Sequence, residues 1–244
     1  MPEMETKEEN KSQGVSPEIE EMFRAGVHFG YSRTRRHPKM QPYLFGLRNN
    51  IEVFDLEEVR KKIEEAERFL KDLAEKRGVL VLVGTKPAVS SLIEKAAEEL
   101  NMPYVASRWP GGLFTNFSEI RKRLDYLEDL KTKRSSGELE KYTKKEQLEF
   151  SEKITRLEQK FAGLVSLRKL PEAILLVDPC EESIATREAS QLGIKRVGIV
   201  SSDCNPELVT YAIPANDSAP SSVKYILERL TAAYKGAVPK NEKS

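Results

Sequence analysis

The chain has 244 residues with a hydrophobic content of 39%, and its 40 Lys and Arg against 39 Asp and Glu leave a net charge of +1. This length allows one well-buried core with an appendage, and it excludes two full enzymatic domains. The near-zero total charge says nothing about an acidic or basic partner, so only the distribution of charge along the chain is informative.

The first residues and the cysteines indicate a cytosolic protein. The acidic start, Met1 to Glu5, lacks the basic and apolar regions of a signal peptide, and no apolar stretch is long enough to span a membrane. The two cysteines, Cys180 and Cys204, cannot form a disulfide framework. In a reducing compartment we expect both to be free thiols with a structural role.

The amino-terminal segment, residues 1–16, is predicted to be a disordered tail. Charged and polar side chains dominate it, and no apolar periodicity offsets the entropy of ordering it. A short helix follows, with the Ser16 hydroxyl as its cap, Pro17 at its first position and Gly26 at its end.

A basic arm extends from Met22 to Ile51 and contains no Asp or Glu. Its interleaved aromatic residues, prolines and glycines predict an irregular segment. A segment of this kind attracts a phosphate backbone, although a solvated loop anchored by its aromatics is the alternative. The cations of the arm are Arg24, Arg33, Arg35, Arg36, Lys39 and Arg48.

The next elements alternate between strand and helix. Apolar patterns predict an edge strand at 51–54, a helix at 56–76, a buried parallel strand at 79–83, a helix ending near 100 and a strand at 104–106. This order places Lys86 and Arg108 at the carboxyl edge of one sheet, where α/β folds usually bind ligands.

The stretch from Tyr104 to Asn116 is interpreted as the joint between the sheet and a helical hairpin. Pro110, Gly111 and Gly112 force a sharp bend there. The only tryptophan, Trp109, precedes this bend and either stacks on a partner or packs at the root of the hairpin.

The hairpin itself is predicted over residues 117–167. Apolar residues recur at spacings of three and four from Phe117 to Leu127 and again from Phe150 to Leu164, with Ser-Ser-Gly between them. This pattern predicts an inserted antiparallel coiled-coil hairpin. Its seam could instead serve dimerisation, but internal pairing already satisfies the apolar stripe.

The chain returns to the sheet at Pro171. The remaining elements are predicted as strands at 173–177, 197–200 and 211–213, helices at 181–192 and 219–234, and a fraying end from Lys235. The fold class is therefore α/β, a parallel sheet formed by residues 17–116 and 168–235 and interrupted by the hairpin, with a disordered tail at 236–244.

Motifs of the common enzyme classes are missing: the chain has no phosphate-binding P-loop, no Gly-x-Gly-x-x-Gly after a strand and no His-Glu-x-x-His. Asp178 and Asp203 follow adjacent strands and could hold Mg²⁺, but both are more simply turn or cap residues. We predict no catalytic residue, no cofactor and no metal. The alternative is a nucleotide- or phosphate-binding enzyme that uses Lys86 with these two carboxylates at the carboxyl edge.

A zinc site is a second metal hypothesis. Cys180 and Cys204 together with His28 and His37 have suitable ligand types, but no Cys-x-x-Cys spacing supports the site.

A set of short motifs occurs in a distinctive order along about residues 17–235. They are Ala25-Gly26-Val27-His28-Phe29-Gly30, Pro38-Lys39-Met40, Tyr43-Leu44-Phe45-Gly46, Val83-Gly84-Thr85-Lys86, Arg108-Trp109 with Gly111-Gly112 and Thr115-Asn116, Leu192-Gly193-Ile194, and Pro214 with Asn216-Asp217. Together they closely resemble the bacterial ribosomal protein S2 family of the small subunit. Tyr31 stands where the family commonly has a histidine, which argues against a histidine-dependent metal site.

The resemblance implies a Rossmann-like (flavodoxin-like) domain with a protruding coiled coil, in a non-enzymatic, structural component of the cytoplasmic ribosome. Such a protein supports translation, binds small-subunit ribosomal RNA near the junction of head and body, contacts neighbouring ribosomal proteins, and is associated with docking of the large S1 protein. A free coiled-coil adaptor that binds only proteins is a further hypothesis.

The arm and the Arg108 loop match family motifs in regions suited to RNA contact. We therefore expect cations at phosphates and aromatic rings for stacking or packing. The expected RNA-binding residues are Tyr31, Arg33, Arg35, Arg36, Lys39, Arg48, Lys86, Arg108 and Trp109.

Overall fold

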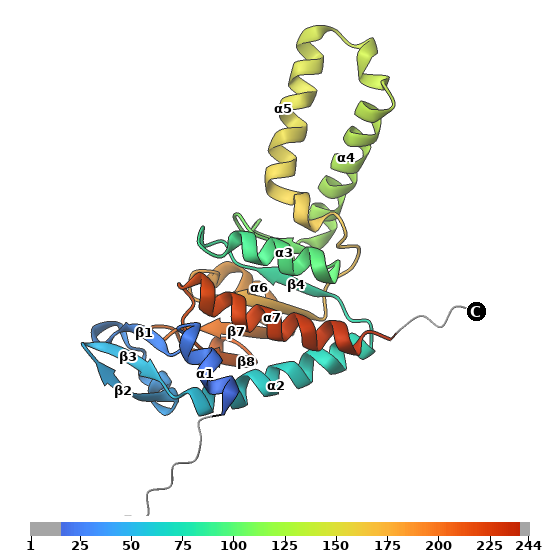
Figure 1. The fold of residues 1–244 in the computed structure, drawn as a ribbon. Coiled ribbons are helices and arrows are strands. Elements are labelled where there is room, and N and C mark those ends of the chain that lie inside the picture. The colour runs from blue at the N-terminus through green and yellow to red at the C-terminus, as the bar shows by residue number, and fades with distance from the viewer. Residues whose placement is uncertain (1–15, 240–244) are drawn as a thin grey trace, which may run out of the picture.

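The computed structural model describes residues 16–239, which fold as two sheets with their covering helices and one projecting helix pair (Figure 1). Of the predicted tails at 1–16 and 236–244, residues 1–15 and 240–244 lie outside the described residues. The helices are α1 (Pro17–Arg24), α2 (Leu56–Glu75), α3 (Ser90–Leu100), α4 (Phe117–Ser135), α5 (Lys144–Phe161), α6 (Ser183–Gln191) and α7 (Pro220–Ala237). The strands are β1 (Phe29–Ser32), β2 (Leu44–Arg48), β3 (Ile51–Phe54), β4 (Leu80–Val83), β5 (Tyr104–Val105), β6 (Ala173–Val177), β7 (Lys195–Val200) and β8 (Tyr211–Pro214).

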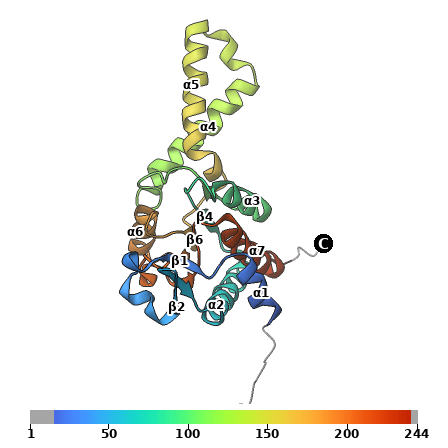
Figure 2. The ribbon, with the colours of Figure 1, turned by 60° about the vertical axis from the view of Figure 1, so that its left-hand side comes forward.

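The larger sheet is parallel throughout and has the strand order β5-β4-β6-β7-β8. Two of its interior strands, β4 and β6, are buried along their whole length, as their continuous apolar sequences predict. Helices α2, α3 and α7 lie on one side of the sheet and α6 lies on the other (Figure 2). The predicted parallel α/β sheet is confirmed.

Helices α2 and α7 pack against each other, and both contribute buried apolar faces to the core. Asp55 caps α2 by accepting a hydrogen bond from the Glu57 amide at 2.9 Å, and the predicted apolar face of α2 is buried. Helix α7 continues to Ala237, so the expected fraying from Lys235 is wrong for its first three residues. Lys235 instead pairs with Glu99 of α3 at 3.0 Å.

The basic arm is not irregular. It forms a three-stranded antiparallel sheet in the order β1-β3-β2, so β3 is the central strand and not the predicted edge strand. Asn49 and Asn50 both have positive φ values, 50° and 61°, and form the two-residue turn between β2 and β3. Such turns require left-handed residues, and asparagine tolerates that conformation.

Helices α4 and α5 project together from the large sheet, away from the small one (Figures 1 and 2). Leu124, Leu127 and Ile154 are fully buried along their seam, and Lys131 pairs with Glu158 across it at 2.8 Å. Both helices lie within residues 117–167, the range that the sequence predicts for the hairpin. Their winding as a coiled coil stays a prediction.

No helix within residues 16–239 is both long and apolar enough to cross a membrane.

Candidate nucleic-acid interface

The cations of the arm fall into two groups. Arg33, Arg35 and Arg48 are exposed and have no ion pair within residues 16–239, and the Arg35 guanidinium lies 5.7 Å from the centre of the Tyr31 ring. A guanidinium over a tyrosine face keeps its charge available while its orientation is restricted. These side chains meet the requirements for contact with phosphate.

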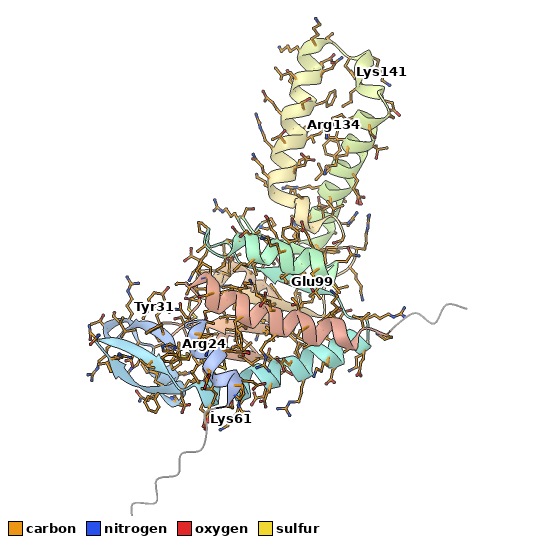
Figure 3. The ribbon with its side chains drawn as sticks, in the orientation of Figure 1. Arg24, Tyr31, Lys61, Glu99, Arg134 and Lys141 are labelled. Carbon is orange, nitrogen blue, oxygen red and sulfur yellow. A yellow bond between two sulfur atoms is a disulfide. The ribbon has the colours of Figure 1, made fainter. Side chains whose placement is uncertain are left out.

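The other three cations of the arm are engaged within the protein, and the first of them, Arg24 (Figure 3), pairs with Glu20 of α1 at 3.6 Å. Arg36 Nη1 lies 3.4 Å from Glu52 Oε1, and the Glu52 side chain is only 3% exposed. Lys39 pairs with Glu207 at the surface. Because Glu52 lies on the central strand β3, Arg36 compensates a buried carboxylate and is less free to bind a ligand.

Lys86 lies at the carboxyl edge of β4, as predicted, but it is not a free cation. Its Nζ lies 2.7 Å from Asp178 Oδ2 and 3.0 Å from Asp217 Oδ2. Burial alone would lower the pKa of Lys86, but the two carboxylates outweigh it and raise that pKa. Lys86 therefore neutralises an internal acidic pair.

The Arg108 loop is organised around Glu188, a residue of α6 that the sequence analysis did not single out. The Glu188 carboxylate is 6% exposed, and it accepts hydrogen bonds from Trp109 Nε1 at 3.1 Å, the amide of Gly112 at 2.8 Å and the amide of Phe114 at 2.9 Å. A further pair comes from the Thr115 amide and hydroxyl at 3.2 and 3.3 Å.

These bonds decide the role of Trp109. The indole is only 6% exposed and packs edge-on against Phe114, with their ring centres 4.9 Å apart. The packing alternative is therefore the one observed, and the ring offers no face to a base. Arg108 is exposed beside it. Gly112 has φ +83°, so the bend depends on this glycine, while Gly111 faces open space.

The arm is seated on two loops of the large sheet. The Tyr31 amide donates to Ser202 Oγ at 2.7 Å, and the His37 amide donates to the Ser202 carbonyl at 2.8 Å. The Tyr31 hydroxyl lies 2.7 Å from Ser218 Oγ. At Gly30 a Cβ would lie 2.8 Å from Ser202 Oγ, so only glycine permits this close approach.

The cysteine prediction is wrong. Cys180 and Cys204 are joined as a disulfide, with 5.9 Å between their Cα atoms, and no free cysteine is found in the described chain. Sequence reasoning missed the bond because the loops after β6 and β7 meet only when the parallel strands are adjacent, and 24 residues separate the two cysteines.

The described residues contain one group of potential metal ligands, Asp178, Cys180 and Cys204, whose ligand atoms lie within 4.8 Å of one another. Neither histidine belongs to it, so the zinc set that includes His28 and His37 does not assemble. In the disulfide state the two sulfurs offer no thiolate, and Asp178 is held by Lys86. These side chains do not fit a metal in this form.

Asp178 and Asp203, at the carboxyl edge of the large sheet, are not arranged as a catalytic pair. Asp178 has φ +60°, and its Oδ1 accepts from the Cys180 and Glu181 amides at 3.1 and 3.2 Å, which is the turn and cap role that the sequence favoured. Burial raises the pKa of Asp203.

His28 is buried against an apolar surface beside the arm. Its ring stacks on Phe23 with 4.3 Å between centres, and burial lowers the pKa of the imidazole. A groove between α1 and the small sheet adjoins it. The exposed apolar side chains of this groove are Phe23, Phe29, Phe45 and Leu47, and Phe45 is 80% exposed. An apolar surface of this kind is typical of a protein contact.

Comparison with known proteins gives a consistent result. The family model described as "Ribosomal protein S2" matches residues 22–237. A Thermus thermophilus protein named "Small ribosomal subunit protein uS2" is 41% identical over 211 residues, which cover 86% of this chain and 82% of the relative. A Dictyoglomus thermophilum protein of the same name is 40% identical over 215 residues, covering 88% and 87% of the two chains.

Proposed function

Because the chain belongs to the ribosomal protein S2 family, which is structural and not enzymatic, we propose that its basic arm binds ribosomal RNA within the small ribosomal subunit. The family makes it a component of the cytoplasmic ribosome. The alternative of a nucleotide- or phosphate-binding enzyme finds no support, since Lys86 is already neutralised by two carboxylates.

One observation carries the proposal. Arg33 and Arg35 lie on the short 3-10 turn that follows β1, Arg48 is the last residue of β2, and all three are exposed with no acidic partner among the described residues. Unpaired guanidinium groups on a rigid support bind phosphate oxygens strongly and release counterions from the nucleic acid. The Tyr31 ring packs against the Arg35 guanidinium, and the Tyr31 hydroxyl is hydrogen-bonded to Ser218 Oγ.

The remaining residues predicted to bind RNA differ in how freely they can contact it. Arg108 is exposed at the joint and is a further candidate for phosphate contact. Arg36 and Lys39 have internal partners and contribute less, while the environments of Lys86 and Trp109 favour structural roles.

The finer family properties are also proposals. We assign the RNA contact to the head–body junction by resemblance to the family, with the α4–α5 pair as its coiled coil. Docking of the S1 protein is supported by the exposed apolar groove around Phe45, which a protein segment would cover.

The test is the salt dependence of RNA binding. The triple change Arg33→Glu, Arg35→Glu and Arg48→Glu is expected to lower affinity for small-subunit RNA and to flatten the slope of log K against log salt by ~0.7–0.9 per lost phosphate contact. Filter binding over a range of KCl concentrations measures that slope.

A matched control reverses three exposed lysines elsewhere, Lys61, Lys169 and Lys224, whose side chains are 55–60% exposed. It changes the net charge equally, so it separates local contact from general repulsion. Equal losses in both triple variants, or an unchanged slope in the arginine variant, contradict the proposal.

A further inference from the structure

The Cys180–Cys204 disulfide joins the loop after β7, whose Ser202 holds the basic arm, to the loop after β6. Cys180 follows Asp178 at the end of β6, and Cys204 lies two residues after Ser202 at the end of β7. The Cys180 side is exposed, whereas Cys204 is fully buried. The bond is therefore accessible to a thiol from one side only.

A continuous chain of contacts starts at Tyr31 of the arm, passes through this disulfide and returns to Tyr31. On one side, Ser202 Oγ accepts a hydrogen bond from the Tyr31 amide at 2.7 Å, and Ser202 lies two residues before Cys204. On the other side, the Tyr31 hydroxyl lies 2.7 Å from Ser218 Oγ, which donates to Asp217 at 3.0 Å.

Lys86 connects the two sides. It forms ion pairs with both Asp217 and Asp178, and Asp178 accepts a hydrogen bond from the Cys180 amide at 3.1 Å. The disulfide is the one covalent link between the two loops at this edge of the described chain. Without it the Ser202 loop and the Asp178 turn are coupled only by packing and hydrogen bonds.

We propose that the Cys180–Cys204 disulfide is a reversible redox clamp: oxidised, it holds the basic arm in its RNA-binding position, and reduced, it releases the arm and lowers RNA affinity. Disulfides in reducing compartments are usually transient or redox-sensing, which fits an exposed bond beside a functional surface. Only the affinity part of this proposal depends on the proposed RNA function.

The chemistry is thiol–disulfide exchange with a dithiol. A thiolate of the dithiol attacks the sulfur of Cys180, the exposed residue of the pair, and Cys204 leaves as a thiolate that takes up a proton. The second thiol of the reagent then displaces Cys180, so the protein gains two electrons and two protons while the dithiol becomes a cyclic disulfide.

The experiment compares oxidised and dithiothreitol-reduced full-length protein by amide hydrogen exchange and RNA binding. Reduction is expected to speed exchange of the Tyr31 and His37 amides, both bonded to Ser202, by roughly tenfold, while β4 and β6 stay unchanged. RNA affinity is expected to fall about fivefold as the arm loses its preorganisation.

A substitution gives the control. Cys180→Ser replaces an exposed residue, so folding is expected to persist, and the variant should behave like reduced wild type with or without dithiothreitol. The wild-type comparison needs no substitution and stands even if the variant folds poorly. Thiol counting by mass spectrometry verifies each state.

The outcomes separate the two proposals. The clamp proposal is contradicted if millimolar dithiothreitol fails to reduce the disulfide. It is also contradicted if reduction leaves the exchange rates of the arm amides unchanged. If exchange responds but affinity does not, while the arginine triple variant loses affinity, the clamp does not govern RNA binding. If exchange responds and neither redox state nor the arginines affect affinity, the proposed RNA function fails and only the mechanical clamp on the arm survives.

Discussion

Trp109 Nε1 donates a hydrogen bond to Glu188 Oε1 at 3.1 Å, and this pair joins the root of the projecting helices to α6, 79 residues further along the chain. The same carboxylate holds the backbone amides of Gly112 and Phe114. A loop of apolar residues and glycines is thereby fixed by one buried acid. The direction of α4 therefore depends on a side chain of α6, the helix on the other side of the large sheet from α2, α3 and α7.

Glu188→Gln is expected to destabilise the protein by about 2–3 kcal/mol. The glutamine NH2 group that replaces one carboxylate oxygen donates and cannot accept, so roughly half of the donors that face Glu188 lose their acceptor while they remain buried. Urea unfolding followed by the fluorescence of Trp109, the only tryptophan, measures the loss. The exposed Glu181→Gln serves as the control, and equal stability of the two variants would contradict the structural role of Glu188.

Acid should weaken the same contact. Burial alone would raise the pKa of Glu188, but the bonds from Gly112, Phe114 and Trp109 outweigh it and lower that pKa below the ordinary 4.5. A depressed carboxyl pKa stabilises the fold above about pH 4.5, and that stability is lost as the pH falls through the folded-state pKa. Unfolding curves between pH 3 and 6 should show this loss in wild type and not in Glu188→Gln.

Trp109→Phe is expected to leave RNA affinity within about twofold of wild type and to lower stability by about 1–2 kcal/mol, because the phenyl ring keeps the packing but lacks the donor to Glu188. Filter binding and urea unfolding report the two effects separately. A large loss of affinity with unchanged stability would show that the indole touches RNA.

The sequence predicted the regular elements well because local pattern determines them. The buried runs of β4 and β6 and the apolar face of α2 are readable from spacing alone. The arm was misread because its prolines and glycines suggested irregular structure, whereas Asn49 and Asn50 supply a tight turn that pairs its strands.

The sequence predicted where the cations of the candidate site lie but not which of them form ion pairs within the protein. Exposed arginines could be located from an acid-free segment, yet which cations are paired depends on contacts between distant segments. Arg36 meets Glu52 across the small sheet, and Lys86 meets Asp217, 131 residues away. The sequence carried no signal for Glu188, since its donors all belong to a remote loop and most of them are backbone amides.

Arg36→Met is expected to act on stability more than on RNA binding. The change leaves Glu52, 3% exposed, without its cation, at a cost of about 1–3 kcal/mol. The double variant with Glu52→Gln should recover part of that loss, because no buried charge then stays unpaired. A salt slope flattened by ~0.7–0.9 with unchanged stability would instead mean that Arg36 contacts a phosphate.

The acidic pair around Lys86 predicts a pH dependence of the opposite sign to that of Glu188. Burial raises the pKa of Asp217 from 3.8 to about 6, because its side chain is 1% exposed and Asp178 shares the same ammonium. A carboxyl whose pKa is raised by folding binds its proton more tightly in the native state, so stability falls as the pH rises from about 4 to about 6.

Asp217→Asn should remove that contribution, which amounts to about 3 kcal/mol at most, since one pKa unit corresponds to about 1.4 kcal/mol. Asparagine keeps one acceptor oxygen, so it can still accept from Lys86 or from Ser218 but not from both. Urea unfolding of wild type and variant at half-unit intervals from pH 4 to 7 measures the difference. Parallel curves for the two proteins would show that Asp217 is already ionised at pH 4 and that Lys86 outweighs the cost of its burial.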